Sequence, residues 1–248
     1  MLHGMTSKSR VRASRRTNRH REHSKRKTDW AVEVFEGPPL GPNVVSASVD
    51  EVMAAINALP SDLNWDDVAD RLVPVFPRLR PPPPGAPDAL RVVVPPGISL
   101  GFGIDAGPAF IAVDQLMVRR WGIEPELVLD RALANVDQLI AKTQPREVVR
   151  LVIENTPVAA LQSSSGSAST YVLRPVALGR LLGDGNRLVI APMRNLLLSM
   201  PSEVDRGFAV ALFEDIALQD PNCLPPMAFL LRNGDVKLEP LGDPYGQA

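Results

Sequence analysis

Short apolar segments come in adjacent pairs along this chain, and a tight turn joins the members of each pair. The clearest pairs are 98–104 with 109–113, 188–191 with 195–200, and 227–231 with 236–238. Asn233-Gly234, which joins the last pair, is the strongest short hairpin signal in the sequence. Helical patterns fall between the pairs, so we predict an α+β fold with a mixed, largely antiparallel sheet and packed helices. A doubly wound, three-layer α/β fold is the alternative.

Capping residues and apolar periodicity indicate where the helices between these pairs lie. Helices are expected at about 50–59, 114–121, 124–142, 174–182 and 203–218. Asp114 is placed to cap one of them, and Pro125 suits the first turn of the next. Asn64 or Asp62 caps a further helix, whose apolar residues at helical spacing continue to Val75.

The charge distribution divides the chain into an arm and a body. Residues 7–27 hold ten of the 27 Lys and Arg residues but only one of the 28 Asp and Glu residues, a balance of +9. The rest of the chain has 17 basic and 27 acidic residues, a balance of −10. We predict a disordered basic tail at 1–28, a linker at 29–49, a single α+β domain at 50–240 and an irregular tail at 241–248.

The basic tail has three interpretations. It can neutralise phosphates and make weak, nonspecific contact with nucleic acid, although no aromatic residue among its charges can stack on bases. It can also be a solvated tail, or sequence upstream of the true start of the protein. No apolar segment follows it, which argues against a signal peptide, and no run of about 18 apolar residues occurs anywhere. We therefore expect a cytoplasmic protein without membrane contact.

The positions of histidine and cysteine exclude several kinds of chemistry from the body. All three histidines, His3, His20 and His23, lie in the N-terminal stretch. The body therefore has no Ser-His-Asp triad, no Cys-His pair and no histidine-ligated metal. The single cysteine, Cys223, allows neither an intrachain disulfide nor a cysteine zinc cluster. No glycine-rich phosphate motif occurs, and we predict no catalytic residue, no metal and no cofactor.

Two pairs of polar residues are candidates for ligand binding. Asp105 and Asp114 flank a strand of the first predicted hairpin, and they can converge at one end of it for acid–base work. Turn formation and helix capping are simpler roles for both, because Asp oxygens accept free backbone N–H groups. Arg194 and Asn195 lie between two apolar segments, where the planar guanidinium can hold a carboxylate or phosphate. A structural ion pair is the simpler role for this arginine.

Several stretches of the body resemble the bacterial YtpQ-like family of unknown function. They are FPRLRP at 76–81, GFGIDAGPAFIAVDQLMVRRWGI at 101–123, ELVLDRALANVDQLI at 126–140, RLVIAPMRNLLLS at 187–199 and PMAFLLRNG at 226–234. The resemblance runs from about residue 50 to 236 and implies a single cytoplasmic α+β unit, with no activity to transfer. The family pattern near Pro192 and Arg194 resembles Pro-x-Arg-Asp. Asn195 replaces the acid here, which puts in doubt any role that needs that carboxylate.

These observations favour a non-catalytic binding or scaffold domain with an unidentified protein or small-molecule partner, and with Arg194 near the partner surface. One alternative is a carboxylate-dependent hydrolase or transferase that uses Asp105 and Asp114. A separation of more than roughly 10 Å between the two carboxyls excludes it, because paired glycosidase carboxyls span no more than that. The other alternative is nucleic-acid binding through the basic N-terminal arm.

Overall fold

The computed structural model describes residues 32–36, 49–60, 62–77, 88–107, 110–163, 166–183, 185–217 and 223–241. The basic tail predicted at 1–28 lies outside these ranges, and so does all but the first residue of the tail predicted at 241–248. The four candidate ligand-binding residues all lie within them.

Helices and strands follow one another in groups along the described chain. The α-helices are α1 (Val49–Asn57), α2 (Trp65–Val68), α3 (Gln115–Trp121), α4 (Pro125–Lys142), α5 (Pro175–Leu182) and α6 (Arg206–Ala217). The 3-10 helices are η1 (Ala69–Arg71), η2 (Pro145–Glu147) and η3 (Ala168–Leu173). The strands are β1 (Val32–Glu36), β2 (Leu72–Val75), β3 (Val92–Val94), β4 (Ile98–Asp105), β5 (Phe110–Ala112), β6 (Val148–Ile153), β7 (Thr156–Gln162), β8 (Arg187–Met193), β9 (Leu196–Pro201), β10 (Met227–Arg232) and β11 (Asp235–Pro240).

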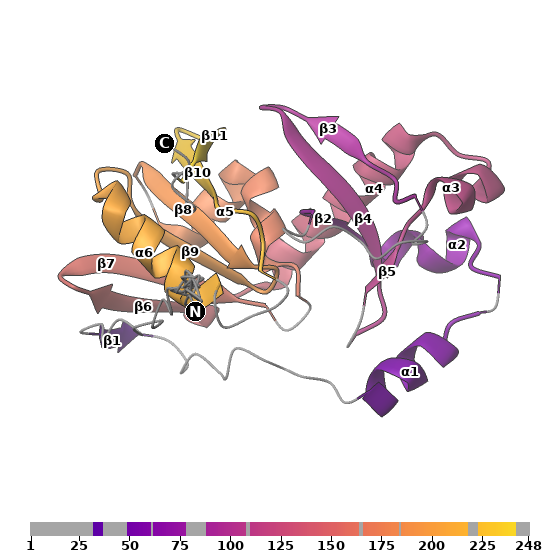
Figure 1. Ribbon diagram of the computed structural model, residues 1–248, viewed down its shortest axis with the longest axis horizontal. Coiled ribbons are helices and arrows are strands. Elements are labelled where there is room, and N and C mark those ends of the chain that lie inside the picture. Colours follow the sequence, from indigo (N-terminus) through magenta and orange to yellow (C-terminus); the bar gives the residue numbers. More distant parts are fainter. Residues whose placement is uncertain are drawn as a thin grey trace, which may run out of the picture.

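The strands form two sheets, and the predicted α+β class is confirmed. The larger sheet has the strand order β1-β6-β7-β9-β8-β10-β11, and the smaller has β2-β4-β3 with β5 also paired to β4. Every described strand pair is antiparallel. Figure 1 shows a larger lobe, built from the larger sheet with α5 and α6, beside a smaller lobe, built from the smaller sheet with α2 and α3.

The larger sheet buries apolar side chains on both of its faces. On one face they pack with α5, η3 and the C-terminal half of α4, and on the other with α6. Along β8, Val189 belongs to the first of these cores and Ile190 to the second, as the two-residue period of a strand requires. Because both faces are covered there, the segments that form β8, β9 and β10 are almost continuously apolar.

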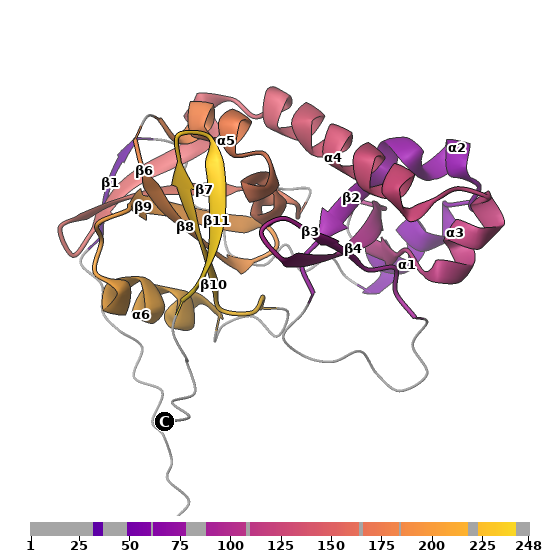
Figure 2. The same cartoon turned by 90° about the horizontal axis from the view of Figure 1, so that it is seen from above.

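Helix α4 connects the two lobes, as Figure 2 shows from above. Near its N-terminus Val128 packs into the core of the smaller sheet, and farther along Val136 packs into the core of the larger one. Phe76, which follows β2, also belongs to the core of the larger sheet, and its ring centroid lies 5.6 Å from that of Phe229. The apolar core therefore continues from one sheet to the other.

Several local predictions are confirmed. β10 and β11 pair across Asn233 and Gly234, which have φ values of 50° and 87°. Pro125 is the first residue of α4, and Gly122 ends α3 with a φ of 67°. At each of these positions the residue type meets a local backbone requirement, either the fixed φ of proline or a positive φ.

The predicted continuation of the helix after Asn64 as far as Val75 is wrong, because residues 72–75 form β2 and pair with β4. Pro74 explains the difference, since proline lacks the N–H that a helix interior requires and its ring clashes with the preceding turn. Asn135 on α4 supports the strand, because its buried side-chain Nδ2 donates to the carbonyl oxygen of Leu72 at 2.9 Å.

Besides β2, two more strands lie where the sequence predicts none. β1 lies within the predicted linker at 29–49 and pairs with β6. β7 pairs with β6 and β9 inside the larger sheet. Its Pro157 weakens the strand signal, because proline has no backbone N–H and is uncommon within sheets. The turn before β7 consists of Glu154 and Asn155, with φ values of 48° and 63°.

Candidate functional site

The structure does not bring Asp105 and Asp114 together. Asp105 ends β4 and pairs with Phe110 of β5, whereas Asp114 follows Phe110 by four residues. At about 3.3 Å per residue, the backbone of Asp114 lies roughly 13 Å farther along this extended segment than the backbone of Phe110. The Asp105 carboxylate accepts the N–H of Gly107 at 2.7 Å. The Asp114 carboxylate accepts the N–H of Met117 at 2.8 Å and caps α3. The two carboxylates therefore serve a turn and a helix cap.

Asp105 is half-buried, and its contacts are those of a turn residue. Burial raises the pKa of its carboxyl above the usual value, against the opposing effects of the Gly107 N–H and the Arg71 charge. Arg71 binds the backbone here, because its Nε donates to the carbonyl oxygen of Asp105 at 2.8 Å. These contacts fix the end of β4 at the start of the β4–β5 turn.

Arg194 and Asn195 form the turn between β8 and β9, on the side of the larger lobe that meets the smaller one. Their carbonyl oxygens accept the N–H groups of Ser169 and Ser163 at 2.9 Å each. The guanidinium carbon of Arg194 lies 5.9 Å from the centroid of the Phe110 ring, which belongs to β5 of the smaller lobe. An aromatic ring attracts a cation at this distance, so Arg194 helps to join the two lobes.

Phe110 packs against glycine backbone contributed by both lobes. A Cβ on Gly166 would lie 2.9 Å from the Phe110 ring, and a Cβ on Gly103 would lie 3.3 Å from the Phe110 Cβ. Only glycine lets the ring approach Gly166 this closely. Arg194, Phe110 and Gly166 therefore form a contact between the lobes, which we name the lobe joint. Of the predicted residues, Asp105 is linked to this joint through its strand partner Phe110, whereas Asp114 is not.

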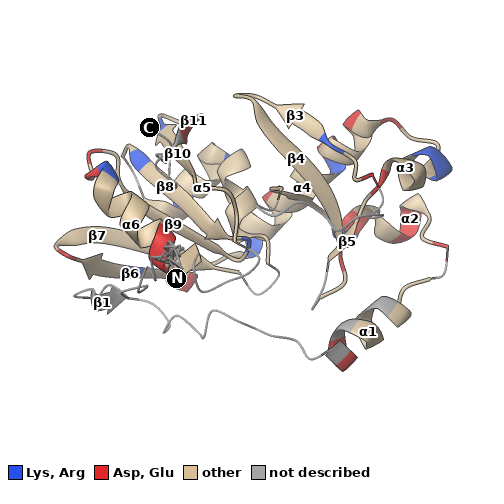
Figure 3. Cartoon of the chain, in the orientation of Figure 1, with Lys and Arg blue, Asp and Glu red and all other residues tan. Residues whose placement is uncertain are grey.

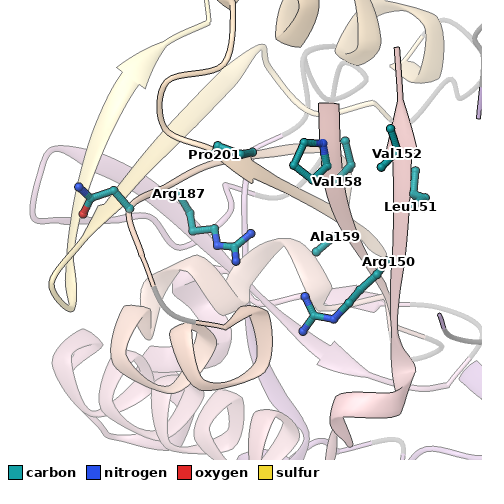
Figure 4. A pocket seen from close by; sticks show the side chains of 9 residues that line it. Arg150, Leu151, Val152, Val158, Ala159, Arg187 and Pro201 are labelled. Carbon is teal, nitrogen blue, oxygen red and sulfur yellow. The ribbon is translucent and has the colours of Figure 1, made fainter. Parts of the chain in front are cut away.

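A cavity of about 360 Å³ opens on the α5-covered face of the larger sheet, away from the lobe joint. The side chains that define it belong to Arg150, Val152, Pro157, Ala159, Arg187 and Pro201. Figure 4 shows the guanidinium groups of Arg150 and Arg187 directed toward the same space, with Ala159 between them. The cavity therefore places two cations above a floor that is otherwise largely apolar, and we name it the arginine pocket.

The strand register explains why a hollow forms at this place. Arg150 on β6 pairs with Ala159 on β7, which in turn pairs with Ser199 on β9. Arg187 on β8 pairs with Pro201 of β9. Two long side chains therefore reach inward from β6 and β8 over the small side chains of the two strands between them. The small residues leave the space that the guanidinium groups border.

Arg187 is the cation of the arginine pocket whose guanidinium has no acidic partner among the described residues. Burial lowers the pKa of Arg187, and the charge of Arg150 lowers it further. Arg150 Nη1 donates to the carbonyl oxygen of Leu182 at 3.4 Å, at the C-terminal end of α5. A helix end carries about half a negative charge, which favours a guanidinium at this place, and Arg150 takes part in further interactions.

Charged residues outside the arginine pocket lie mostly at helix ends and turns, and some of them form ion pairs. Figure 3 shows most of the acidic and basic residues of the described chain at helix ends and turns. Arg174, just before α5, makes two contacts with the carboxylate of Asp137 on α4, one of them at 2.7 Å from Nε to Oδ1. The Arg174 hydrogen bond lowers the pKa of Asp137 below its usual value. An arginine paired in this way is neutralised, in contrast to Arg187.

Neither Arg150 nor Arg187 is among the site residues that the sequence predicts. A signal was present for Arg150, because it interrupts the apolar run VVRLVI of β6. The two arginines share a site only through the neighbour relations β6–β7–β9–β8, and β7 itself was not predicted. The pocket therefore depends on long-range pairing that a single sequence does not display.

Comparison of the chain with protein-family models, with curated proteins and with solved structures finds no match. Within the described ranges, no three His, Cys, Asp or Glu side chains are grouped so that they could hold a metal ion. No helix in the part of the chain that the structure describes is long and apolar enough to span a bilayer. Function is therefore inferred from the chemistry of the site itself.

Proposed function

We propose that this protein is a non-catalytic binding domain and that the arginine pocket binds an anionic ligand. The observation that carries the proposal is the environment of Arg187, whose guanidinium faces a cavity and a second cation, with no ion pair to a described carboxylate. An anion between the two guanidinium groups would offset their mutual repulsion. Arg150 takes part in further interactions, so we assign the main anion contact to Arg187.

The lining of the pocket favours binding over catalysis. Its polar side chains among the described residues are Arg150, Asn186 and Arg187. A guanidinium stays protonated and an amide does not titrate, so neither acts as a general acid or base near neutral pH. None of the three is a nucleophile of the kinds that form covalent intermediates. The pocket has the groups to hold a charged ligand and lacks groups to transform it.

The structure bears on the other hypotheses from the sequence to different degrees. Because Asp105 and Asp114 serve a turn and a helix cap, we do not propose a carboxylate-dependent hydrolase or transferase. The binding role first considered for Arg194 moves to Arg187, because Arg194 contacts Phe110 within the lobe joint. A cytoplasmic location and membership of the YtpQ-like family stay proposals, supported by the single cysteine and by the sequence resemblance. Nucleic-acid binding by the arm concerns residues outside the described ranges.

Thermal unfolding in the presence of simple anions tests this proposal. The full chain is unfolded in sodium acetate or sodium phosphate and in sodium chloride, at equal ionic strength. An anion at ten times its dissociation constant should stabilise the folded state by about 1.4 kcal/mol, equivalent to a rise in Tm of roughly 3–6 °C. Arg187→Met should lose this rise.

Arg120→Met is the matched control, because Arg120 is exposed on α3 and the substitution removes the same charge while leaving the basic arm intact. The control should keep the full response to acetate or phosphate. An equal response in Arg187→Met and Arg120→Met would contradict the proposal, since the anion would then bind elsewhere.

A further inference from the structure

The arginine pocket has one cationic side and one apolar side. The guanidinium groups of Arg150 and Arg187 border the space, and the floor consists of Val152, Pro157, Ala159 and Pro201. A ligand that fits this arrangement carries its negative charge at one end and an apolar group at the other. The floor, and not the charge alone, therefore defines which anions suit the pocket.

The floor also argues against phosphate-based ligands. No aromatic side chain lines the pocket in the described chain, so nothing there can stack on a nucleotide base. Phosphate-binding loops surround the anion with backbone N–H groups. Pro157 and Pro201 have no backbone N–H, so the floor lacks such donors at both positions.

The size and the cations favour a small organic acid. The volume of about 360 Å³ is near the lower end of the roughly 300–1,000 Å³ typical of small-molecule sites. A carboxylate accepts two parallel hydrogen bonds from one guanidinium, which gives strong and directional binding. A short aliphatic chain would cover the apolar floor, and each methylene group removed from water would strengthen binding.

We propose that the arginine pocket binds a small aliphatic carboxylate, with the carboxylate on Arg187 and the chain over Val152, Pro157 and Pro201. This inference rests on the proposed function, because it names the ligand class of the same site. It goes further in assigning a role to the apolar floor, which anion binding alone does not need.

A series of acids of increasing length tests the inference. Isothermal titration of the full chain with acetate, butyrate, hexanoate and octanoate should show affinity rising up to about fourfold for each buried methylene. The rise should stop once the chain extends beyond the floor. Hexanamide, which has the same chain without the charge, should bind at least tenfold more weakly than hexanoate. Inorganic phosphate should bind no more tightly than acetate.

One variant tests the contribution of the apolar floor, and a second variant elsewhere in the molecule is its control. Val152→Thr adds a hydroxyl to the floor at nearly constant shape and should reduce the gain in affinity per methylene between butyrate and octanoate. Val93→Thr is the matched control, because Val93 is 70% exposed on β3 of the smaller lobe. The control should reproduce the length dependence of the unmodified chain.

The outcomes distinguish this inference from the proposed function. Equal affinities from acetate to octanoate, together with loss of binding in Arg187→Met, would overturn the aliphatic ligand and leave anion binding intact. Equal binding of hexanamide and hexanoate would overturn both. The length series uses the unmodified chain, so its result does not depend on the folding of any variant.

Discussion

Strand β8 has an arginine at each end, and the two arginines meet different partners. Arg187 begins the strand and faces the arginine pocket, where burial and the charge of Arg150 lower the pKa of its guanidinium. Arg194 follows the end of the strand and lies over the Phe110 ring of the smaller lobe. The same residue type thus borders a cavity at one end of β8 and a packed contact between the lobes at the other.

This difference shows why residue type alone does not identify a binding site. The position of Arg194 between apolar segments predicts a binding residue, but an arginine so placed can be stabilised by an aromatic ring. Arg187 is not predicted in this way, although its surroundings offer a cavity and no ion pair with a described carboxylate. We therefore assign structural stability to the Arg194 end and ligand binding to the Arg187 end.

The largest expected effect is at the lobe joint. Phe110→Ala should destabilise the protein by roughly 2 kcal/mol, below the 3–5 kcal/mol of a fully buried phenylalanine because Phe110 is only partly buried. Chemical denaturation measures the change. Phe110→Leu, which keeps most of the apolar volume, should lose about half as much. A loss below 0.5 kcal/mol for Phe110→Ala, on the order of a surface substitution, would show that the contact does not hold the lobes together.

A smaller effect is expected from the cation at the joint. Arg194→Met should lower the free energy of unfolding by about 0.5–1 kcal/mol, the usual size of a cation–π contact at a partly exposed site. In Phe110→Leu the same substitution should cost less, because the ring is absent. A double-mutant cycle measures this coupling. Independent, additive effects would mean that the Arg194–Phe110 contact contributes nothing, and the contrast between the ends of β8 would weaken.

A pH-dependent effect is expected at Asp105, the strand partner of Phe110. Its folded-state pKa is raised by burial, so the ionised carboxylate destabilises the fold, and stability is lost as the pH rises through that pKa. Asp105→Asn should therefore be more stable than the unmodified chain at neutral pH, by up to about 0.5 kcal/mol. Below the ordinary pKa of aspartate the advantage should vanish. Thermal unfolding of both chains between about pH 3 and pH 7, which covers the titration of carboxyl groups, measures this stability difference. A stabilisation by Asp105→Asn that grows as the pH falls would contradict a raised pKa for Asp105.

The smallest effect is expected beneath the arginine pocket. Ser199 is fully buried, and its Oγ has no hydrogen-bond partner among the described residues. Ser199→Ala should leave stability within about 0.5 kcal/mol or raise it slightly, because an unpaired buried hydroxyl contributes little. Acetate affinity should also stay unchanged, since Ser199 does not line the cavity. A loss of affinity would show that the ligand reaches deeper than the floor formed by Ala159 and Pro201.

Local residue chemistry predicted much of the fold. Asp114, Pro125 and the Asn233-Gly234 turn each meet a requirement of their own backbone, so their roles follow from sequence. The helical spacing of apolar residues as far as Val75, with Pro74 and Pro77 as its end, predicts a helix where residues 72–75 instead form a strand, because pairing with β4 decides the structure. β7 was not predicted because its strand signal depends on neighbours that are distant in sequence.

The candidate site was harder to predict for the same reason. Turn and cap roles for Asp105 and Asp114 were recognised beforehand as the simpler interpretation, and the structure places both residues in those roles. Arg150 and Arg187 are 37 positions apart in the sequence and share a pocket only because β7 and β9 lie between their strands. No short sequence motif predicts that these two arginines lie in one pocket.

The central claim, that ligand binds at the Arg187 end of β8 and not at the Arg194 end, is tested most directly by NMR of the arginine side chains. Nitrogen-15 spectra of the Nε–H groups are recorded while hexanoate is added to the full chain, with Arg187→Lys and Arg194→Lys used to assign the two signals. We predict that the Arg187 signal shifts and saturates, whereas the Arg194 signal stays in place. Saturable movement of the Arg194 signal with no change at Arg187 would contradict the account.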